Sequence, residues 1–270
     1  MQRRPDSYRR TILAVDFAPF LVDSHDSVGV AFDAVKLHPD MRIHTGRFGR
    51  EKAPLLVIED FLADPEELVQ IASAQRFTEH ARYFPGIRAT APQEYREVFA
   101  AGLQGTIAEH FDLSGEISFS LCAFSLITTP ADQLTVPQRI PHVDSLAGSG
   151  LACIHYLFKR NLGGTAFYRH RKTGFEFVDE QRSATYLQSL DAEDVRPENW
   201  GRGYINGDSV LFEQIARSEG IFNRLLVYRR NSLHSGCIAA DFVPDANPAS
   251  GRLSINGFLE LGGAANTLSQ

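Results

Sequence analysis

Histidine and aspartate residues spaced two apart are the first feature of this sequence that could do chemistry. In an extended segment such side chains point to the same side, so an imidazole and a carboxylate can bind one metal ion. For nine histidines and 17 aspartates in 270 residues, chance predicts roughly 0.6 such pairs. The chain contains His38-Pro39-Asp40, His110-Phe111-Asp112 and His142-Val143-Asp144. At least two of these pairs are therefore expected to be accidental.

Two of the pairs lie in unsuitable local structure. His110 and Asp112 lie at the end of an amphipathic helix expected over residues 92–111, where a step of two points side chains about 200° apart. His110 there is expected to interact favourably with the helix C-terminus. His38 precedes a proline in a segment without a strand pattern, and a solvated turn is the better interpretation.

The third pair lies where a ligand pair could be used. His142 follows Pro141, a setting that favours extended geometry, and the chain then leads into a strand expected at 151–158. This is the entrance to the β-rich part of the chain. His142 and Asp144 are therefore predicted to be metal ligands.

A third ligand is expected from a later strand. His155 lies inside the apolar run LACIHYLF and is expected to be a core histidine. His170 has an arginine on either side, a cationic setting that disfavours a bound cation. His234 ends the strand-like run NRLLVYRRNSLH, and a Ser-Gly turn follows it. Strand ends that open into loops often carry ligands, so His234 is the predicted third ligand.

The last expected strand, 252–261, offers an anion site. Alternation places Arg252 and Ser254 on the same face of that strand. An inward-facing arginine would be costly unless it met an anion, and a guanidinium fork beside a hydroxyl suits a carboxylate. An exposed arginine on an edge strand is the alternative, because the pattern leaves the buried face of this strand open. Arg224, Arg229 and Arg230 are poorer candidates.

The elements that position these residues come in a clear order. A strand at 55–61 is followed by a helix that Asp64 caps and Pro65 begins, and then by the helix at 92–111. From residue 116 the hydrophobic period changes to two, as in EISFSLCAFSLIT. Further strands are expected at 151–158, 164–169, 224–229 and 252–261, around a polar insertion at about 171–203.

This order indicates an α+β fold, with an antiparallel sandwich or jelly roll and helices packed outside it. We divide the chain into an unplaced N-terminal extension, 1–50, and a single domain, 51–270. The insertion is a candidate lid, because a polar loop over a barrel mouth can exclude water.

Composition excludes several classes of protein. Hydrophobic residues make up 43% and charged residues 22%, as in ordinary globular chains. The net charge of −6 argues against a nucleic-acid partner, which needs a basic face. No run approaches the roughly 18 apolar residues that span a bilayer, so no membrane partner is expected.

The N-terminus and the cysteines predict a cytoplasmic protein. The basic start MQRRPDSYRR resembles a signal peptide, but Asp16 interrupts the run that follows and a small-residue cleavage site is lacking. Cys122, Cys153 and Cys237 form neither a CxxC pair nor a plausible disulfide framework. Buried, reduced thiols are the expected state.

Taken together, His142-x-Asp144, His234 and Arg252-x-Ser254 resemble the iron(II)- and 2-oxoglutarate-dependent oxygenases in order and spacing. The stretch GGTAFYRH resembles a Gly-Gly-Thr stretch common in that superfamily, and LLVIEDFLADPEEL resembles the strand-then-helix start of many members. The span 55–261 is most similar to an uncharacterised bacterial family within the superfamily. One departure is that many members place the arginine about ten residues after the distal histidine, whereas 18 separate the two here. The intervening segment contains two prolines and is expected to be a loop, so the strand register can survive.

The resemblance implies a double-stranded β-helix in which His142, Asp144 and His234 hold Fe(II). It implies 2-oxoglutarate as cosubstrate, with its distal carboxylate on Arg252 and Ser254. Tyr156 is a further candidate contact, although aromatic side chains mostly serve packing. The implied activity is a dioxygenase, an oxidoreductase that couples decarboxylation of 2-oxoglutarate to oxidation, as in hydroxylation, of a second substrate.

Two other hypotheses stay open at this point. A cupin-like metalloprotein without 2-oxoglutarate chemistry would keep the three ligands and give Arg252 no cosubstrate role. A non-catalytic β-sandwich binding module would keep the fold and have lost turnover. The substrate could be a free amino acid, a peptide, a protein residue or a small metabolite, and the oligomeric state is not predicted.

Overall fold

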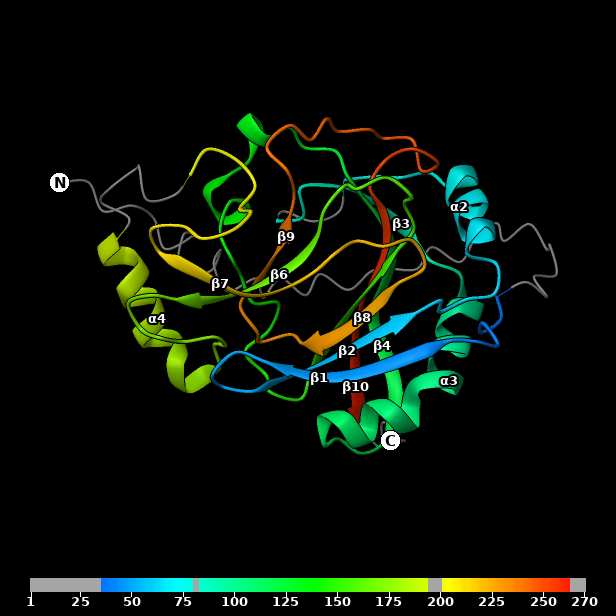
Figure 1. The fold of residues 1–270 in the computed structure, drawn as a ribbon, viewed down its shortest axis with the longest axis horizontal. Coiled ribbons are helices and arrows are strands. Elements are labelled where there is room, and N and C mark those ends of the chain that lie inside the picture. Colours follow the sequence, from blue (N-terminus) through cyan, green and yellow to red (C-terminus); the bar gives the residue numbers. More distant parts are fainter. Residues whose placement is uncertain (1–34, 80–82, 194–200, 263–270) are drawn as a thin grey trace, which may run out of the picture.

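The computed structural model describes residues 35–79, 83–193 and 201–262. The basic start and most of the 1–50 extension lie outside the described residues, as do residues 194–200 of the expected insertion. The described chain forms two antiparallel sheets with few helices (Figure 1). In spatial order, the large sheet contains β1 (Arg42–Phe48), β2 (Ala53–Glu59), β8 (Leu225–Arg229), β5 (Leu151–Tyr156), β10 (Leu253–Gly262), β4 (Glu116–Ile127) and β3 (Gly86–Thr90). The small sheet contains β7 (Phe212–Ser218), β6 (Gly164–His170) and β9 (His234–Cys237).

Helices α2 (Pro65–Ala74) and α3 (Gln93–Phe111) provide the side chains that cover the outer face of the large sheet. The predicted period of four in α3 is confirmed, because Tyr95, Phe99, Leu103 and Ile107 are all fully buried. They pack in one core with alternate residues of β4, β5, β8 and β10. Two short 3₁₀ turns, η1 (Ala131–Gln133) and η2 (Val136–Gln138), follow β4 on the way to the predicted ligands.

The expected strands correspond to β2, β4, β5, β6, β8 and β10, and four further strands went unrecognised. β1, RIHTGRF, is an edge strand with mostly exposed side chains, so it lacks a hydrophobic alternation. It falls in the range that the sequence left unplaced and pairs with β2 over its whole length. β3, β7 and β9 are short or polar, and neighbouring strands rather than their own residues stabilise them.

Two local predictions need correction. Asp64 occupies the N-cap position of α2, but its side chain makes no capping hydrogen bond. The expected insertion was interpreted as a polar loop, whereas Glu180–Glu193 forms helix α4. Tyr186 and Leu190, four residues apart, are buried in the core of the small sheet. With so few apolar positions among charged ones, the helical period of α4 was hidden in the sequence.

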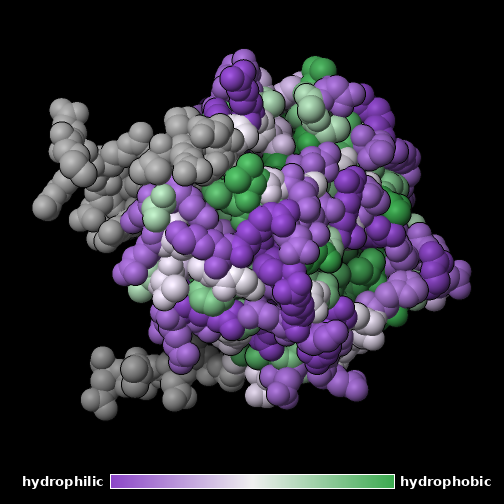
Figure 2. All heavy atoms as spheres, turned by 60° about the vertical axis from the view of Figure 1, so that its left-hand side comes forward, coloured by the Kyte–Doolittle hydropathy of each residue, from purple (hydrophilic) through white to green (hydrophobic). Residues whose placement is uncertain are grey.

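The surface is mainly hydrophilic. The face drawn in Figure 2 shows polar side chains with separate hydrophobic patches between them. Among the described residues the exposed large hydrophobic side chains are Val210, Ile221 and Val243. No helix in the described part of the chain is long and apolar enough to cross a membrane.

Candidate metal centre

Three predicted ligands meet at the small sheet. The Nε2 atom of His234 lies 3.4 Å from Oδ2 of Asp144, and Nε2 of His142 lies 3.7 Å from Oδ1 of the same carboxylate. One ligand atom from each residue lies within 4.8 Å of the other two. Ligands at about 2.1 Å from one octahedral ion are roughly 3 Å apart, so small side-chain movements suffice to bind one. The described residues form this single group suited to a metal.

Backbone hydrogen bonds bring the ligands together. His142 and His234 exchange two N–H···O=C bonds of 2.9 and 3.0 Å, which add the segment around His142 to the small sheet beside β9. The N–H of Asp144 donates to the carbonyl of Arg230 at 2.8 Å. Residues 230–234 therefore fix both ligand segments at once, although the sequence separates them by about ninety residues.

The two histidines are prepared for coordination. Nδ1 of His234 lies 3.0 Å from the carbonyl of Ser232, which requires its proton there and leaves the Nε2 lone pair toward Asp144. Burial, and then the nearby His234, lower the pKa of His142 to about 4 against the opposing effect of Asp144. The His142 ring is therefore neutral at pH 7 and can bind a cation. With 35% of its side chain exposed, His142 marks the open side of the group.

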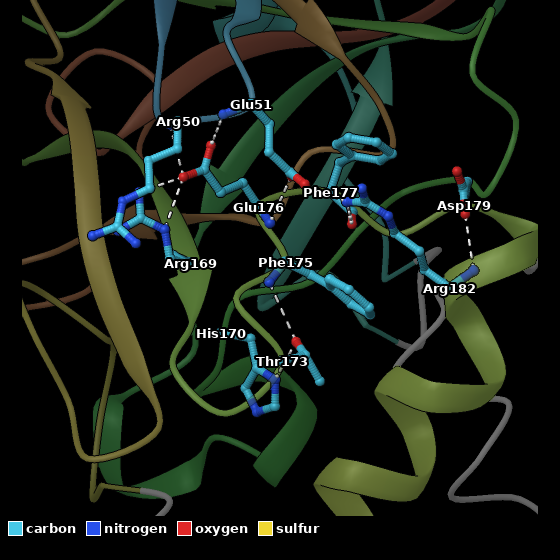
Figure 3. A network of polar contacts seen from close by, with 10 residues as sticks. All are labelled: Arg50, Glu51, Arg169, His170, Thr173, Phe175, Glu176, Phe177, Asp179 and Arg182. Carbon is cyan, nitrogen blue, oxygen red and sulfur yellow. Dashed lines mark hydrogen bonds and ion pairs between the residues drawn. The ribbon is translucent and has the colours of Figure 1, made fainter.

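A polar network holds the 230–234 segment in place, and Figure 3 shows its centre, the Glu176 carboxylate beside Arg169, Arg50 and Glu51. The backbone of Glu176 accepts from the N–H of Leu233, and Val178 N–H donates to the carbonyl of Asn231. The buried Glu176 carboxylate accepts from Nε of Arg169 at 2.9 Å and from the N–H groups of Arg50 and Glu51.

The charge state of Glu176 follows from these contacts. Burial works to raise its pKa, but the two backbone donors and Arg169 together lower it, so the carboxylate is ionised. Sequence reasoning missed this support because Glu176 lies in the segment interpreted as an insertion. The alternation of Phe175, Glu176 and Phe177 favours an outward-facing carboxylate, so the local sequence indicates the opposite of what the structure shows.

The rejected pairs and histidines lie elsewhere, as predicted. His38 lies at a turn, where its Nδ1 accepts from the N–H of Asp40. His110, near the end of α3, is half-buried, and its Nε2 lies 3.1 Å from the carbonyl oxygen of Gly46 in β1, not at the helix C-terminus as expected. His155 is buried, lies 3.1 Å from Oδ1 of Asn223 and stacks on Tyr95. His170 pairs with Glu193 in the core beneath α4.

Arg252 is buried on the face of the large sheet that looks toward the small one. Its Nε and Nη2 donate to the carbonyls of Leu162 and Gly164 at 3.0 and 2.9 Å. Within the described chain it forms no ion pair with a carboxylate, and burial lowers its pKa. The 239–252 segment before it is loop and turn, as predicted, so β10 keeps its register with β4 and β5.

The other predicted cosubstrate residues lie beside Arg252. The ring of Tyr156 is 6.0 Å from the Arg252 guanidinium, and its hydroxyl donates to Thr165 Oγ1 at 2.8 Å. Tyr156 is fully buried and packs in the aromatic core that lies beside Arg252. Ser254 pairs with Tyr156 across β10 and β5, and its hydroxyl donates to Asn256.

The Gly-Gly-Thr stretch explains how these groups approach. Gly163 has φ +81°, and a Cβ there would lie 2.1 Å from the carbonyl oxygen of Cys237. A Cβ on Gly164 would lie 1.9 Å from the carbonyl oxygen of Ser218. Only glycine therefore lets β6 pass so close to its neighbours. This passage brings the Gly164 carbonyl to Arg252 and the Thr165 hydroxyl to Tyr156.

The arginines judged to be poorer candidates are engaged elsewhere. Arg224 pairs with Glu59, Arg229 donates to backbone carbonyls including that of Phe111, and Arg230 pairs with Glu260. A guanidinium already bound to a carboxylate or to carbonyls has little capacity left for a ligand.

One family model matches most of the chain. The model of a family described as Family of unknown function (DUF6445) matches residues 39–259, which confirms the prediction of an uncharacterised family. A comparison with curated protein sequences finds no match.

Solved structures with a similar fold include three whose names mention 2-oxoglutarate or alpha ketoglutarate. HygX from Streptomyces hygroscopicus, with nickel and 2-oxoglutarate bound, is 11% identical, with 78% of this chain and 84% of that chain covered and a TM-score of 0.45. The non-heme alpha ketoglutarate dependent epimerase SnoN from nogalamycin biosynthesis is 10% identical, with 78% and 79% covered and a TM-score of 0.45. EctD from S. alaskensis, with 2-oxoglutarate and 5-hydroxyectoine, is 12% identical, with 85% and 87% covered and a TM-score of 0.39. Because these TM-scores lie below 0.5, we base the function on the chain's own side chains.

Proposed function

The protein belongs to the DUF6445 family, whose description assigns no function, and we propose that it is an Fe(II)- and 2-oxoglutarate-dependent oxygenase. One observation carries the proposal. The His-Asp-His group and an arginine without a carboxylate partner among the described residues both lie on the facing sides of the two sheets, where buried tyrosines connect them. A ring contact of 4.9 Å joins His234 to Tyr228 on β8, and Tyr156 on the adjacent strand lies beside Arg252.

The strand order supports a double-stranded β-helix. In chain order, β4, β5, β8 and β10 lie in the large sheet, and the His142 segment, β6, β7 and β9 lie in the small one. These eight segments divide evenly between two facing antiparallel sheets, as in a jelly roll. In this arrangement the predicted ligands come from two adjacent segments of the small sheet, and Arg252 precedes a strand of the large sheet.

The donor set fits the implied metal. Two neutral imidazoles and one carboxylate on one face of an ion, with the remaining positions open, are typical of non-haem Fe(II) oxygenases. His142, Asp144 and His234 would hold the ion, and the carbonyl of Ser232 would keep the His234 ring in its coordinating tautomer. Iron(II) with 2-oxoglutarate supplies oxidative decarboxylation to succinate and CO2, coupled to the oxidation of a second substrate by dioxygen.

The chain's own residues would bind and orient the cosubstrate. Arg252 keeps N–H donors beyond the two that meet carbonyls, and these suit the distal carboxylate of 2-oxoglutarate. Ser254 lies on the same face and can add a hydroxyl contact once it turns from Asn256. The buried rings of Tyr156 and Tyr228 exclude water between the two ends, which strengthens both electrostatic contacts.

An anaerobic titration tests the proposal. Purified metal-free protein receives Fe(II) and then 2-oxoglutarate, while visible absorbance is recorded. We expect a metal-to-ligand charge-transfer band that requires both additions and is absent in His142→Ala. The matched control is His110→Ala, which removes a half-buried histidine from a rejected His-x-Asp pair and should leave the band unchanged.

The other possible outcomes favour other functions or another metal site. Iron binding without a band on addition of 2-oxoglutarate would contradict the proposal and favour a cupin-like metalloprotein. Absence of iron binding would favour a non-catalytic binding module. A band that survives in His142→Ala and in His234→Ala would place the metal elsewhere and refute the ligand assignment.

A further inference from the structure

A second arginine lies on the inner face of the large sheet, on the edge strand β3. The antiparallel register aligns one residue from each of four neighbouring strands, and residues directly opposite in such pairs point to the same face. Residues on either side of this row pack in the core with α3, so the row itself faces the small sheet. Its members are Arg88, Ser125, Ser254 and Tyr156.

Arg88 packs against an aromatic ring, and no carboxylate among the described residues forms an ion pair with it. Its guanidinium carbon lies 4.2 Å from the centre of the Phe84 ring, so one flat face of the group is covered. Its Nε atom is buried and has no hydrogen-bond partner among the described residues. Burial lowers the pKa of Arg88 to about 10, and the one opposing influence is the charge of Asp144. Arg88 is therefore a half-buried cation with a buried Nε atom, and the charge that acts on it is that of the predicted ligand Asp144.

The charges of the proposed complex leave Arg88 unmatched. The charges of Fe(II), Asp144, Arg252 and doubly charged 2-oxoglutarate cancel, because histidines that bind a metal do so as neutral rings. Both carboxylates of the cosubstrate are then occupied, one at the metal and one at Arg252. With Asp144 engaged by the metal, the desolvated part of this guanidinium is left without a counter-charge, which is costly, and an anion from outside the chain would supply one.

We propose that Arg88 binds a carboxylate of the primary substrate. The proposal rests on the oxygenase function above and narrows its substrate class to acids. A single positive charge matches a carboxylate better than a phosphate dianion. Stacking on Phe84 leaves the in-plane N–H groups free, and these form the fork that binds two carboxylate oxygens. The hydroxyl of Ser125, on the neighbouring strand, lies on the same face and can add a contact.

Acetate serves as the probe for this site. Saturation-transfer NMR measures the acetate methyl signal with metal-free protein and with protein loaded with diamagnetic Zn(II) and saturating 2-oxoglutarate. We expect saturable binding to the loaded protein, at least tenfold weaker in Arg88→Leu and intermediate in Arg88→Lys. Arg171→Leu, which removes an exposed arginine paired with Asp208, is the matched control and should bind acetate as the wild type does.

Melting temperature and substrate screening provide independent readouts. If Arg88 served the fold, its removal would lower the melting temperature. We expect Arg88→Leu to melt at the same temperature as the wild type or higher, because it removes an uncompensated buried charge. In a substrate screen, free acids should stimulate consumption of 2-oxoglutarate, and their methyl esters should not.

Several outcomes would overturn the assignment. Equal acetate binding in wild type and Arg88→Leu, or none in the wild type, removes the anion site. Displacement of acetate by inorganic phosphate at lower concentration than by propionate contradicts the carboxylate preference. If Arg88→Leu raises the 2-oxoglutarate requirement of the charge-transfer band as much as Arg252→Leu, Arg88 is a cosubstrate residue and the oxygenase function stands. Absence of the band in the wild type refutes the oxygenase function itself, and the substrate role falls with it.

Discussion

The two faces of the large sheet are built from alternate residues of the same strands, yet they differ in character. On β10, Leu253 and Ile255 pack against the helices, whereas Ser254 between them faces the small sheet. Burial lowers the pKa of two histidines to about 4. His155 lies on the helix side of the large sheet, and His142 lies beside β9 of the small sheet. His155 stacks on Tyr95 and lies against Asn223, but His142 has an open edge. A neutral imidazole therefore becomes a candidate ligand through access and neighbours, not through its pKa alone.

The largest expected effect comes from the helix side. Phe99→Ala removes a fully buried ring that meets Phe61 and Phe119, and we expect a loss of about 3–5 kcal/mol in the free energy of unfolding. Urea unfolding measures it. The charge-transfer band should persist in the folded variant below its melting temperature. A folded Phe99→Ala protein without the band would show that the two faces are not separate in function. Ile221→Ala, at an exposed site, is the control.

Acid stability tests the histidine on the helix side, His155. The folded-state pKa of His155, about 4, lies below the unfolded value of about 6.5, so the unfolded chain binds the proton first. Stability is therefore lost as pH falls from about 6.5 to 4, by up to about 3 kcal/mol for this group. His155→Phe should unfold with a smaller change over that range, as urea titrations at several pH values can measure. An identical pH dependence in both proteins would contradict the assignment to His155.

Secondary structure was predicted correctly where the pattern lies within the element, and it was missed where pairing with a neighbouring strand determines the structure. The period of four in α3 and the alternation in the first half of β4 are written in their own residues, and both were recognised. β9 has four residues, HSGC, and becomes a strand only because β6 provides its partners. The pair His142 and Asp144 could be proposed from sequence for a similar reason of locality, since the two residues are two positions apart.

Contacts between residues far apart in the chain could not be predicted from the sequence. Nothing near Glu176 indicates that its carboxylate accepts hydrogen bonds from residues 50 and 51, about 125 positions earlier. Arg88 went unnoticed because β3 was not recognised, and without the strand its face and its neighbours could not be inferred. Such contacts depend on the register of distant strands, which short motifs do not encode.

The network behind the ligands should couple stability to metal affinity. Glu176→Gln keeps the shape of the side chain but weakens its bonds to Arg169 and to two backbone donors, at a cost of about 1–3 kcal/mol. Because Glu176 also holds the segment that carries His234, we expect iron affinity to fall by roughly tenfold. Iron titration and urea unfolding measure the two effects. Glu66→Gln, at an exposed pair with Lys159, is the control and should change neither by much. Lower stability with unchanged iron affinity would mean that the network supports only the fold.

The smallest expected effect comes from a substitution on the inner face of the large sheet. Arg252→Leu should raise the 2-oxoglutarate concentration that half-develops the charge-transfer band by more than tenfold, equivalent to about 1.4 kcal/mol. Iron affinity should stay the same, because Arg252 contacts backbone carbonyls of Leu162 and Gly164 and none of the three ligands. Arg252→Lys keeps the charge but not the planar fork, so an intermediate requirement is expected. If iron and 2-oxoglutarate binding weaken equally in Arg252→Leu, the arginine holds β10 to β6 and is not a cosubstrate residue. The inner face would then owe its polar character to packing between the sheets.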